Sequence, residues 1–536
     1  MKLWLIGTVA AAALLTGCGK KDDTAAAGAS ADAIEVAGAE LRAVQLRAGN
    51  ADQAEAALGA LSLTESGSGR ISFGDRSVTG ADASFSNVEI IMADDENDSD
   101  AGLLVAQTLT LKGLDMTDGQ ASFSQMRLDG VTIRSDGDAD EGLLNIADMQ
   151  ISNPSPALAA WVGSLLGQGE PADFPELSEL SFDAASFSNL TAVPSEGEDE
   201  LEEFKIDSVN FRNMSPEGLG AMVLEGLNFR AVDASTGQVS HASLGSLSLM
   251  GVGEVVTKTL GADLDSDQVP AELLQLLAAN PADPGYDVMR LADLDIDVAG
   301  LAIALPSYNQ QVTRDDQGRA VRTVLEPIEA TIGADPNGEF GSELAGPLGL
   351  MGYETLVVRA ASDTRVDHDN DMITTDPKSN YLEVADGFRL SGGGEIEGLS
   401  SFYTKMAEQD LGRSNSDPDA VLSSLSAMQL HGLEISFEDN SFVDRAFSAA
   451  AAMNGGTPDE LKDQLKLSLG LAPLMSQSIG IDPDIVTELT TALGSFISKP
   501  GTLTLSLDPQ TPIGVDMLEN PEALTKDVLG FSATSK

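Results

Sequence analysis

The chain contains 536 residues with a formal net charge of −55, and 42% of its residues are hydrophobic although only 4% are aromatic. This hydrophobic content is ordinary for a globular protein and the length suffices for two or more domains, so we expect the chain to fold. So acidic a chain repels nucleic acid and anionic lipid surfaces, and we therefore expect no nucleic-acid partner. The acidic residues are scattered, which favours a solvated surface suited to a salty medium over a general affinity for divalent cations.

The first 18 residues have the composition of a secretion signal. Lys2 precedes an apolar run, Leu3–Leu14, that is short for a membrane-spanning helix, which needs about 20 residues. Cys18 is the only cysteine of the chain and ends the sequence Leu15-Thr16-Gly17-Cys18. These four residues resemble a bacterial lipobox. The resemblance implies a signal peptide over residues 1–17 and a lipid, carrying acyl chains such as palmitate, on the Cys18 thiol.

The lipobox resemblance also implies a location. Gly19 rather than aspartate follows the cysteine, and in bacterial sorting this implies attachment to the outer membrane, with the body facing the periplasm or the cell surface. The alternatives are an ordinary cleaved signal and an N-terminal membrane anchor with a chance cysteine. If Cys18 carries lipid, no cysteine remains for a disulfide, a metal site or a thiol nucleophile.

The segment behind the cysteine is small and polar over residues 18–35, which is typical of a flexible tether. Residues 36–66 carry apolar residues at helical spacing, among them Leu41, Val44, Leu58 and Leu61. We therefore expect a short helical segment there.

From residue 67 to residue 334 the pattern is that of strands. In a recurring unit, apolar residues alternate, slip by one residue and alternate again. Alternation predicts a strand with one buried face, and the slip predicts a β-bulge. The copies begin at Ala83, Leu109, Met126, Leu144, Leu180, Phe204, Met222 and Met289, and an outlying copy beyond this region begins at Met428.

The clearest pair of copies runs from Leu109 to Ile133 around Asp118-Gly119, a dipeptide that favours a tight hairpin turn. We expect the alternating residues of this hairpin to line either a closed core or an open apolar groove. They are Leu109, Leu111, Leu114, Met116, Met126, Leu128, Val131 and Ile133.

The predicted fold class is α+β and mostly β: a long antiparallel meander of bulged strands, curled or sandwich-like, with helical insertions and a helix-rich C-terminal region. The turn signals between copies favour antiparallel pairing. The copies that begin at Leu109, Met126 and Leu144 are 17 and 18 residues apart, which leaves a parallel β-solenoid as the alternative. We expect helices at Ala157–Leu166 and Ala271–Ala279.

Residues 335–536 are expected to form a second, α+β domain. Predicted strands are Leu356–Val366, Tyr381–Leu390 and Thr502–Leu507. After the triplet Gly392–Gly394 the pattern becomes helical. The predicted helices are Ala420–Met428, Phe442–Met453, one from Pro458, one from Pro483 to Ile497, and Pro521–Leu529.

The acids Asp367, Asp369 and Asp371 alternate as at the start of a calcium loop. Met372 stands at the sixth position, where an EF-hand has glycine, and Lys378 at the twelfth, where it has glutamate. The segment is therefore a weak Ca²⁺ candidate, with a hairpin tip as the competing interpretation. No other cofactor is expected. Nucleophile elbows and phosphate-binding loops are missing from the sequence, so we expect a protein that is not an enzyme. Basic patches are missing as well, which argues against a nucleic-acid partner.

The strand repeats over about residues 70–305 resemble those of AsmA-like envelope proteins, although such proteins begin with a transmembrane helix rather than a lipobox. The stretches 436–447 and 500–518 are similar to uncharacterised secreted proteins of alphaproteobacteria. The leading hypothesis is a non-catalytic, lipid-anchored envelope protein with a binding or structural role and a protein partner. The AsmA-like resemblance implies an alternative, a phospholipid carrier or envelope-assembly factor with an apolar groove. The acid content favours a third, a calcium-dependent surface or adhesion component.

Overall fold

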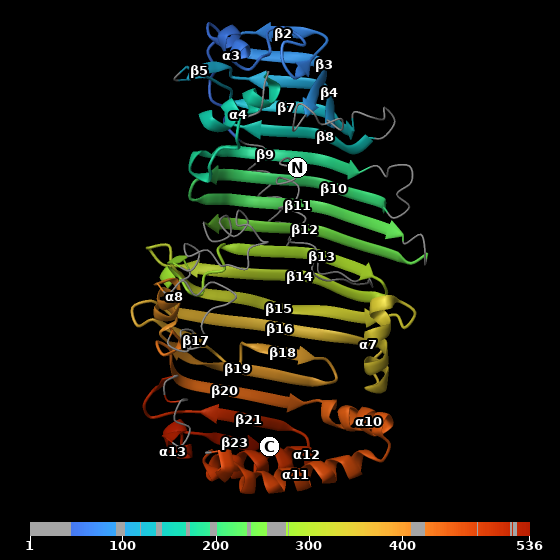
Figure 1. Ribbon diagram of the computed structural model, residues 1–536, viewed down its shortest axis with the longest axis vertical. Helices are drawn as coiled ribbons and strands as arrows, with labels where there is room; N and C mark the ends of the chain where they lie inside the picture. Colours follow the sequence, from blue (N-terminus) through green and yellow to red (C-terminus); the bar gives the residue numbers. More distant parts are fainter. Residues whose placement is uncertain are drawn as a thin grey trace. The chain divides into compact units, whose positions relative to one another are not determined.

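The computed structural model describes residues 44–92, 102–117, 119–135, 142–167, 172–192, 201–232, 237–253, 275–276, 278–408, 424–479, 481–514, 517 and 523–536. It confirms the predicted class, a mostly β chain whose strands form long antiparallel meanders with added helices (Figure 1). All strand pairings between described residues are antiparallel, so the β-solenoid alternative is wrong.

The chain divides into two compact units. The first comprises Met1–Glu254 and Met289–Ala299, and the second comprises Val255–Val288 and Gly300–Lys536. The boundary expected between residues 334 and 335 falls within the second unit. Residues 1–43, which contain the lipobox and the tether, lie outside the described residues, as do Asp118 and most of the predicted helix Ala271–Ala279.

In the first unit, successive strands pair as a meander. β1 and β2 both pair with β3, and β3 is followed in order by β4, β7, β8, β9, β10, β11 and β12. The strands are β1 (Ile71–Ser72), β2 (Arg76–Thr79), β3 (Asp82–Met92), β4 (Gly102–Lys112), β7 (Gln125–Ser135), β8 (Gly142–Ser152), β9 (Phe182–Ala192), β10 (Leu201–Ser215), β11 (Gly218–Val232), β12 (Val239–Gly253) and β13 (Val288–Val298).

The predicted hairpin around residues 118–119 is present but is larger than expected. β4 pairs with β7, with Leu109 opposite Leu128. Between them, β5 (Asp115–Thr117) and β6 (Gln120–Ser122) form a separate two-stranded sheet. Leu114 and Met116 therefore leave the main sheet, because the chain turns away after Gly113, whose φ is +64°.

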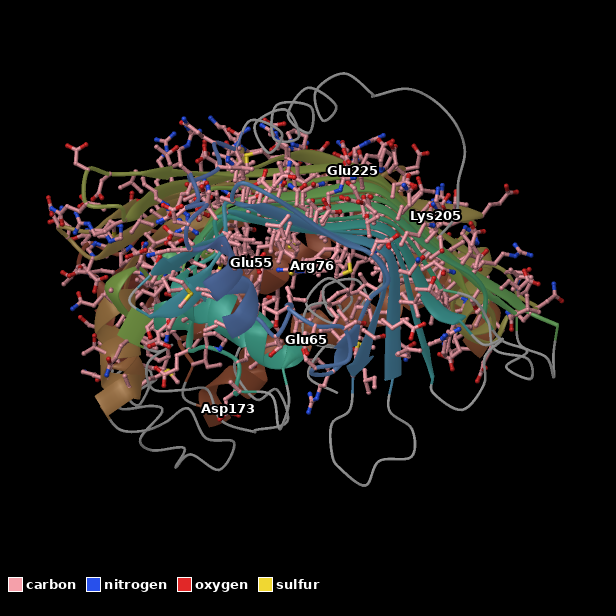
Figure 2. The ribbon with its side chains drawn as sticks, turned by 90° about the horizontal axis from the view of Figure 1, so that it is seen from above. Glu55, Glu65, Arg76, Asp173, Lys205 and Glu225 are labelled. Carbon is pink, nitrogen blue, oxygen red and sulfur yellow. The ribbon has the colours of Figure 1, made fainter. Side chains whose placement is uncertain are left out.

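The slips in the repeat correspond to a row of left-handed residues that crosses the first unit. On alternate strands the residues with positive φ are Asn87, Gly130, Asn189, Gly226 and Asp293. Each lies opposite an unpaired residue of the neighbouring strand, as Gly226 lies beside Asp207. The register on either side stays aligned, so all strands turn at the same place, and they curve over α3 (Ala54–Ala60) and α4 (Pro156–Leu166) (Figure 2).

The alternation in the copies that begin at Leu109 and Leu180 predicts slips at Lys112-Gly113 and at Asp183-Ala184, and both predicted positions are wrong. In β4 the row passes through Gln107 rather than Lys112-Gly113, and in β9 through Asn189 rather than Asp183-Ala184. Both true positions are polar residues within an alternating run, where a slip of one residue is hard to see.

The first unit has two core clusters, one between the strands up to β9 and the two helices, and one over β10 to β12 that includes Leu224 and Leu244. Leu58 and Leu61 from the α3 segment pack with Phe85 and Leu109 of the strands, and all four are fully buried. Ser155 caps α4 by accepting a hydrogen bond from the Leu158 amide, ahead of Pro156 in the first turn. At the rim, Glu55 of α3 pairs with Arg76 of β2 at 2.6 Å (Figure 2).

The second unit is also an antiparallel meander. β14 (Leu301–Arg314), β15 (Ala320–Ala334) and β16 (Thr355–Asp367) pair in order, and β17 (Met372–Thr375) and β18 (Tyr381–Val384) share the position between β16 and β19 (Phe388–Glu397). Beyond β19 come β20 (Gln429–Asp439), β21 (Thr502–Leu507) with β22 (Ile513–Gly514), and β23 (Ser532–Ser535).

The helices of the second unit are α7 (Glu339–Leu350), α8 (Leu399–Glu408), α10 (Phe442–Asn454), α11 (Pro458–Ile479), α12 (Pro483–Ser498) and α13 (Lys526–Leu529). The predictions for α10, α11, α12, β16 and β21 are confirmed. The predicted strand Tyr381–Leu390 is wrong: it is two strands around a turn at Asp386, whose φ is +53°. β19 then continues through the glycine triplet to Glu397, where a helical pattern was expected.

Candidate functional site

The sheet of the second unit has a polar face over β15, β16, β18 and β19. Arg322 pairs with Asp363 at 2.7 Å, and Arg359 bridges Glu329 at 2.7 Å and Glu383 at 3.0 Å. The hydrogen bond from Arg322 lowers the pKa of Asp363. These pairs are partly exposed and screened by solvent, so each contributes little to stability. They keep this face hydrated.

The opposite face of β18 to β21 is apolar, because the pairing register aligns the apolar phase of each strand. Leu390 lies opposite Leu382 of β18 and Phe437 of β20. One step along, Ile435 of β20 lies opposite Gly392 of β19 and Leu505 of β21. Alternating residues point to the same side of a sheet, so these side chains form one surface.

Among the described helices, α10 and α12 pack against this apolar face beside Phe388 and Phe437. The ring of Phe437 stacks on Phe388 at a centroid distance of 5.2 Å. Phe442 of α10 and Phe496 of α12 pack edge-on against this pair, at 5.1 Å from Phe388 and 5.8 Å from Phe437 respectively. The aromatic cluster therefore forms a wall, and the sheet face beside it is left open.

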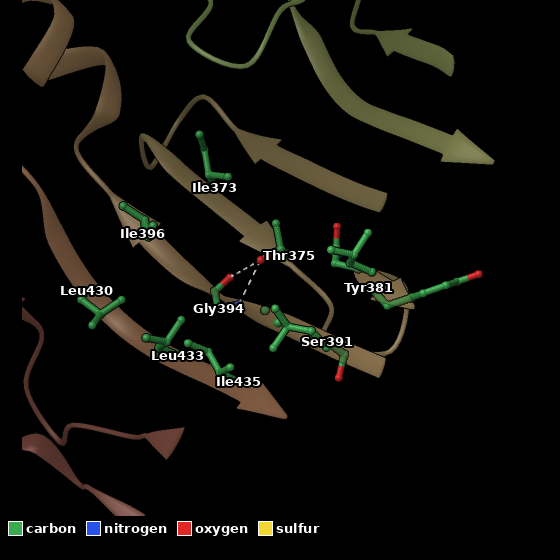
Figure 3. A pocket seen from close by; sticks show the side chains of 15 residues that line it. Ile373, Thr375, Tyr381, Ser391, Gly394, Ile396, Leu430, Leu433 and Ile435 are labelled. Atoms are coloured by element: carbon green, nitrogen blue, oxygen red, sulfur yellow. Dashed lines mark hydrogen bonds between the residues drawn. The ribbon is translucent and has the colours of Figure 1, made fainter. Parts of the chain in front are cut away.

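The open part is a trough that contains a hollow of about 490 Å³ (Figure 3). Leu382, Leu390, Ile396 and Ile435 are 41%, 38%, 37% and 39% exposed there. The full lining is Ile373, Thr375, Asn380, Tyr381, Leu382, Leu390, Ser391, Gly392, Gly393, Gly394, Ile396, Leu430, Gly432, Leu433 and Ile435. A contiguous exposed apolar surface of this kind marks an interaction site, and the volume is within the range of ligand sites.

The three glycines at positions 392–394 have different roles beside the hollow. A Cβ on Gly393 would lie 2.4 Å from Pro377, and one on Gly394 would lie 2.4 Å from the Gly432 carbonyl oxygen, so both are glycines for close packing. A Cβ on Gly392 would meet only the Glu434 carbonyl oxygen, at 3.8 Å. Gly392 therefore leaves space above the sheet that a side chain would otherwise fill.

A smaller hollow of about 160 Å³ adjoins the first. Its lining is Leu433, Ile435, Leu505, Ser506, Leu507 and Phe531. Among the described residues that line either hollow there is no aspartate, glutamate, lysine, arginine or histidine, although 21% of the chain is charged. The trough is therefore matched to the hydrocarbon part of a ligand.

The few polar side chains around the larger hollow are occupied within the protein. Thr375 Oγ1 accepts a hydrogen bond from the Gly394 amide at 3.0 Å (Figure 3). The Asn380 side chain donates to the backbone carbonyl of Asp363 and accepts from its amide, both at 3.1 Å. The Arg389 guanidinium lies 3.8 Å from the ring centroid of Tyr381.

The residues expected to line a core or a groove in the first unit lie in a closed core. Leu109, Leu111, Leu114, Leu128 and Val131 are at most 5% exposed, and Met116, Met126 and Ile133 pack against them. The lipobox residues Leu15, Thr16, Gly17 and Cys18 lie outside the described residues.

The acidic segment Asp367–Asp371 is the tip of the β16–β17 hairpin. Asp367 accepts hydrogen bonds from the Asp369 amide at 3.0 Å and from the Asn370 side chain at 2.7 Å, and the latter lowers its pKa. Asp371 accepts from the Ser400 amide at 3.0 Å, at the start of α8. Two of the three carboxylates thus serve a turn and a helix cap. Within the described part of the chain, no three or more histidine, cysteine, aspartate and glutamate side chains come together as a metal site.

Sequence reasoning missed the trough. The sequence shows the copy from Met428 to Ile435, but the glycine triplet was expected to precede a helical region rather than to continue a strand. The signal was available in β19, where Leu390, Gly392, Gly394 and Ile396 occupy one phase of the strand. Glycine in the apolar phase of a strand indicates a surface from which side chains are missing.

His431 occupies the slip position of the copy that begins at Met428, which predicts a surface residue. It is the extra residue of a bulge in β20, where Ile396 lies opposite Leu430 and Glu395 opposite Gly432. Its ring is half-buried, and Nε2 lies 2.6 Å from the Glu397 carboxylate.

A family model described as "Uncharacterized protein" matches residues 381–536, a stretch that includes β18 to β23 and most of the trough. The search of curated proteins found no match. Of the helices described, none combines the length and hydropathy needed to cross a bilayer. In the described part of the chain, the fold and the trough thus define an antiparallel β-sheet protein with an open apolar face on its second unit.

Proposed function

We propose that the protein is a non-catalytic, lipid-anchored component of the bacterial cell envelope that binds the hydrocarbon chain of a lipid in the trough of its second unit. The observation that carries the proposal is the uncovered apolar surface around Leu390 and Ile435, free of charged lining residues. Burial of a hydrocarbon chain there removes apolar surface from water on both partners.

The backbone pairing favours a hydrocarbon chain over an extended peptide. β19 pairs with β17 and β18 on one side and with β20 on the other, and β20 in turn pairs with β21 and β22. The floor of the trough therefore offers no free strand edge for a peptide to extend. A peptide lying across it would bury its own amide and carbonyl groups without partners, which is costly. A hydrocarbon chain carries no such groups.

The lipid anchor is supported by the lipobox sequence that ends at Cys18 and by the polar residues that follow it. A net charge of −55 keeps the body in solution beside an anionic membrane while the anchor keeps it close. This combination suits a protein that collects or presents a lipid near a membrane surface.

The test uses the full chain and its Cys18→Ser variant, both expressed in a bacterium. We expect the wild type in the membrane fraction with an acyl modification, and the variant in the soluble fraction. Native mass spectrometry of the variant, followed by solvent extraction, should show a stoichiometric lipid. A folded, monodisperse variant that carries no lipid and binds no added fatty acid would overturn lipid binding, and a stoichiometric protein in its place would identify the trough as a protein-docking surface.

A further inference from the structure

The two hollows form one path across the strands. The larger lies over β17 to β20 and the smaller over β20, β21 and Phe531, and Leu433 and Ile435 line both. These two residues lie opposite Leu507 and Leu505 in the β20–β21 pairing. The apolar floor is therefore continuous, and a chain-like ligand in the larger hollow can extend into the smaller one.

The two ends of the path differ in polarity. Thr375, Asn380 and Ser391 lie around the larger hollow. The smaller hollow is lined by aliphatic residues and Phe531, and the hydroxyl of its one polar residue, Ser506, is 2.8 Å from that of Ser532. Because Thr375 and Asn380 are already hydrogen-bonded within the protein, the head group of an amphiphile would stay in water beside the larger hollow, with its methyl end at the smaller.

Phe531 stands where the path ends. By strand alternation it shares a face with Ala533, which lies opposite Leu505 in the β21–β23 pairing. The Ala533 amide donates to Glu488 of α12 at 2.9 Å, so the outer edge of β23 is covered. Among the described strands of this unit, none continues the sheet beyond β23.

The backbone around Phe531 is held on three sides. Its amide donates to the Lys526 carbonyl at 3.1 Å. The Lys526 amide donates to the Asp482 carboxylate at 2.7 Å, which ties α13 to the start of α12. Gly530 is left-handed at φ +56°, and a Cβ there would overlap the Asp508 backbone. The backbone that carries the ring is therefore fixed at the end of the smaller hollow.

We infer, resting on the proposed function, that Phe531 is the end wall of the trough and sets the length of hydrocarbon chain that the protein selects. Each methylene that fits between the larger hollow and Phe531 adds buried apolar surface and raises affinity about fourfold. A methylene beyond the wall stays in water and adds nothing. Affinity thus rises with chain length to a break and then levels off.

The experiment measures displacement of a fluorescent fatty acid from the full-length Cys18→Ser chain by saturated fatty acids from decanoate to behenate. We expect Phe531→Ala to move the break to longer chains while leaving the affinity for decanoate within about twofold. Leu505→Phe brings an aromatic ring one strand nearer the larger hollow and should move the break to shorter chains. Phe340→Ala, which removes a half-exposed ring on α7, should leave the profile unchanged.

The outcomes separate this inference from the proposed function. If the folded wild type binds no fatty acid of any length, the proposed function fails. If it binds with a break that stays in place in both Phe531→Ala and Leu505→Phe, the proposed function stands and the end-wall role is overturned. Phe531→Ala should move the break to longer chains and Leu505→Phe should move it to shorter chains. If one variant fails to fold, the other therefore still tests the end-wall role.

Discussion

Gly392 of β19 lies directly opposite Ile435 of β20 in the centre of the trough, and the Ile435 side chain is 39% exposed there. Because Gly392 has no side chain, the side chain of Ile435 beside it is left uncovered. Alternating apolar residues make this face of the sheet apolar, and the glycine makes it hollow.

Replacement of Gly392 by leucine should fill the trough and abolish lipid binding. A Cβ at this position has room, since its nearest neighbour is 3.8 Å away, so we expect the fold to persist. The matched control is Gly470→Leu on α11, where a Cβ would meet nothing within 4 Å. Fatty-acid displacement should show at least a tenfold loss for Gly392→Leu and no change for Gly470→Leu. Equal binding by the two variants would place the ligand elsewhere.

The closed core and the open trough should respond differently to the same truncation. Leu224 of β11 is fully buried, so Leu224→Ala should cost about 2–5 kcal/mol in the free energy of unfolding of the first unit. Leu390 is 38% exposed, and Leu390→Ala should cost the second unit about 1 kcal/mol or less. Urea titration followed by circular dichroism measures both. A large cost for Leu390→Ala would mean that its face is covered in solution.

The row of left-handed residues should be sensitive to a single methyl group. Gly226 has φ +64°, and its Cβ would lie 2.8 Å from Asp207 Cβ. We expect Gly226→Ala to cost about 2–4 kcal/mol, from backbone strain and overlap together. Gly237 has φ +69° with nothing within 4 Å, so Gly237→Ala reports the strain alone, about 1 kcal/mol. Thermal denaturation of the two variants gives the difference, and equal midpoints would argue against a crowded row.

The clamp between α12 and the C-terminal strand should weaken in acid. Glu488 accepts from the Ala533 amide and pairs with Lys526, and this pairing lowers the pKa of Glu488 and raises that of Lys526. A lowered carboxyl pKa contributes stability that is present above its ordinary value of 4.5 and is lost as the pH falls through the folded-state pKa. The lysine contribution is present below its ordinary value of 10.5 and is lost above it.

Glu488→Gln is the variant that measures this clamp. We expect it to be less stable than the wild type near neutral pH and equally stable in acid below the folded-state pKa of Glu488. A double-mutant cycle with Lys526→Met isolates the ion pair from the hydrogen bond to Ala533. A stability difference that persists unchanged in acid would show that packing, rather than charge, accounts for the effect of Glu488.

Local rules explain most of the elements that the sequence predicted. Alternation at Leu109 and Leu128 marks two paired strands, and Asp482 before Pro483 marks the start of α12, where the Asp482 side chain accepts from the Asp484 amide. The slips at Asp129-Gly130 and Glu225-Gly226 mark left-handed residues. These features depend on neighbours within a few residues, so they can be predicted from the sequence of a single strand or helix.

The sequence by itself determined which face of each strand is apolar. It did not determine what covers that face, because a cover comes from segments far away in the chain. Leu109 is sealed by α3, which precedes it by some fifty residues, and by α4, which follows it by a similar distance. Leu390 has the same alternating pattern around it, but α10 and α12 contact the neighbouring Phe388 and Phe437, and Leu390 remains 38% exposed. Only the tertiary structure decided that the first is core and the second an open trough.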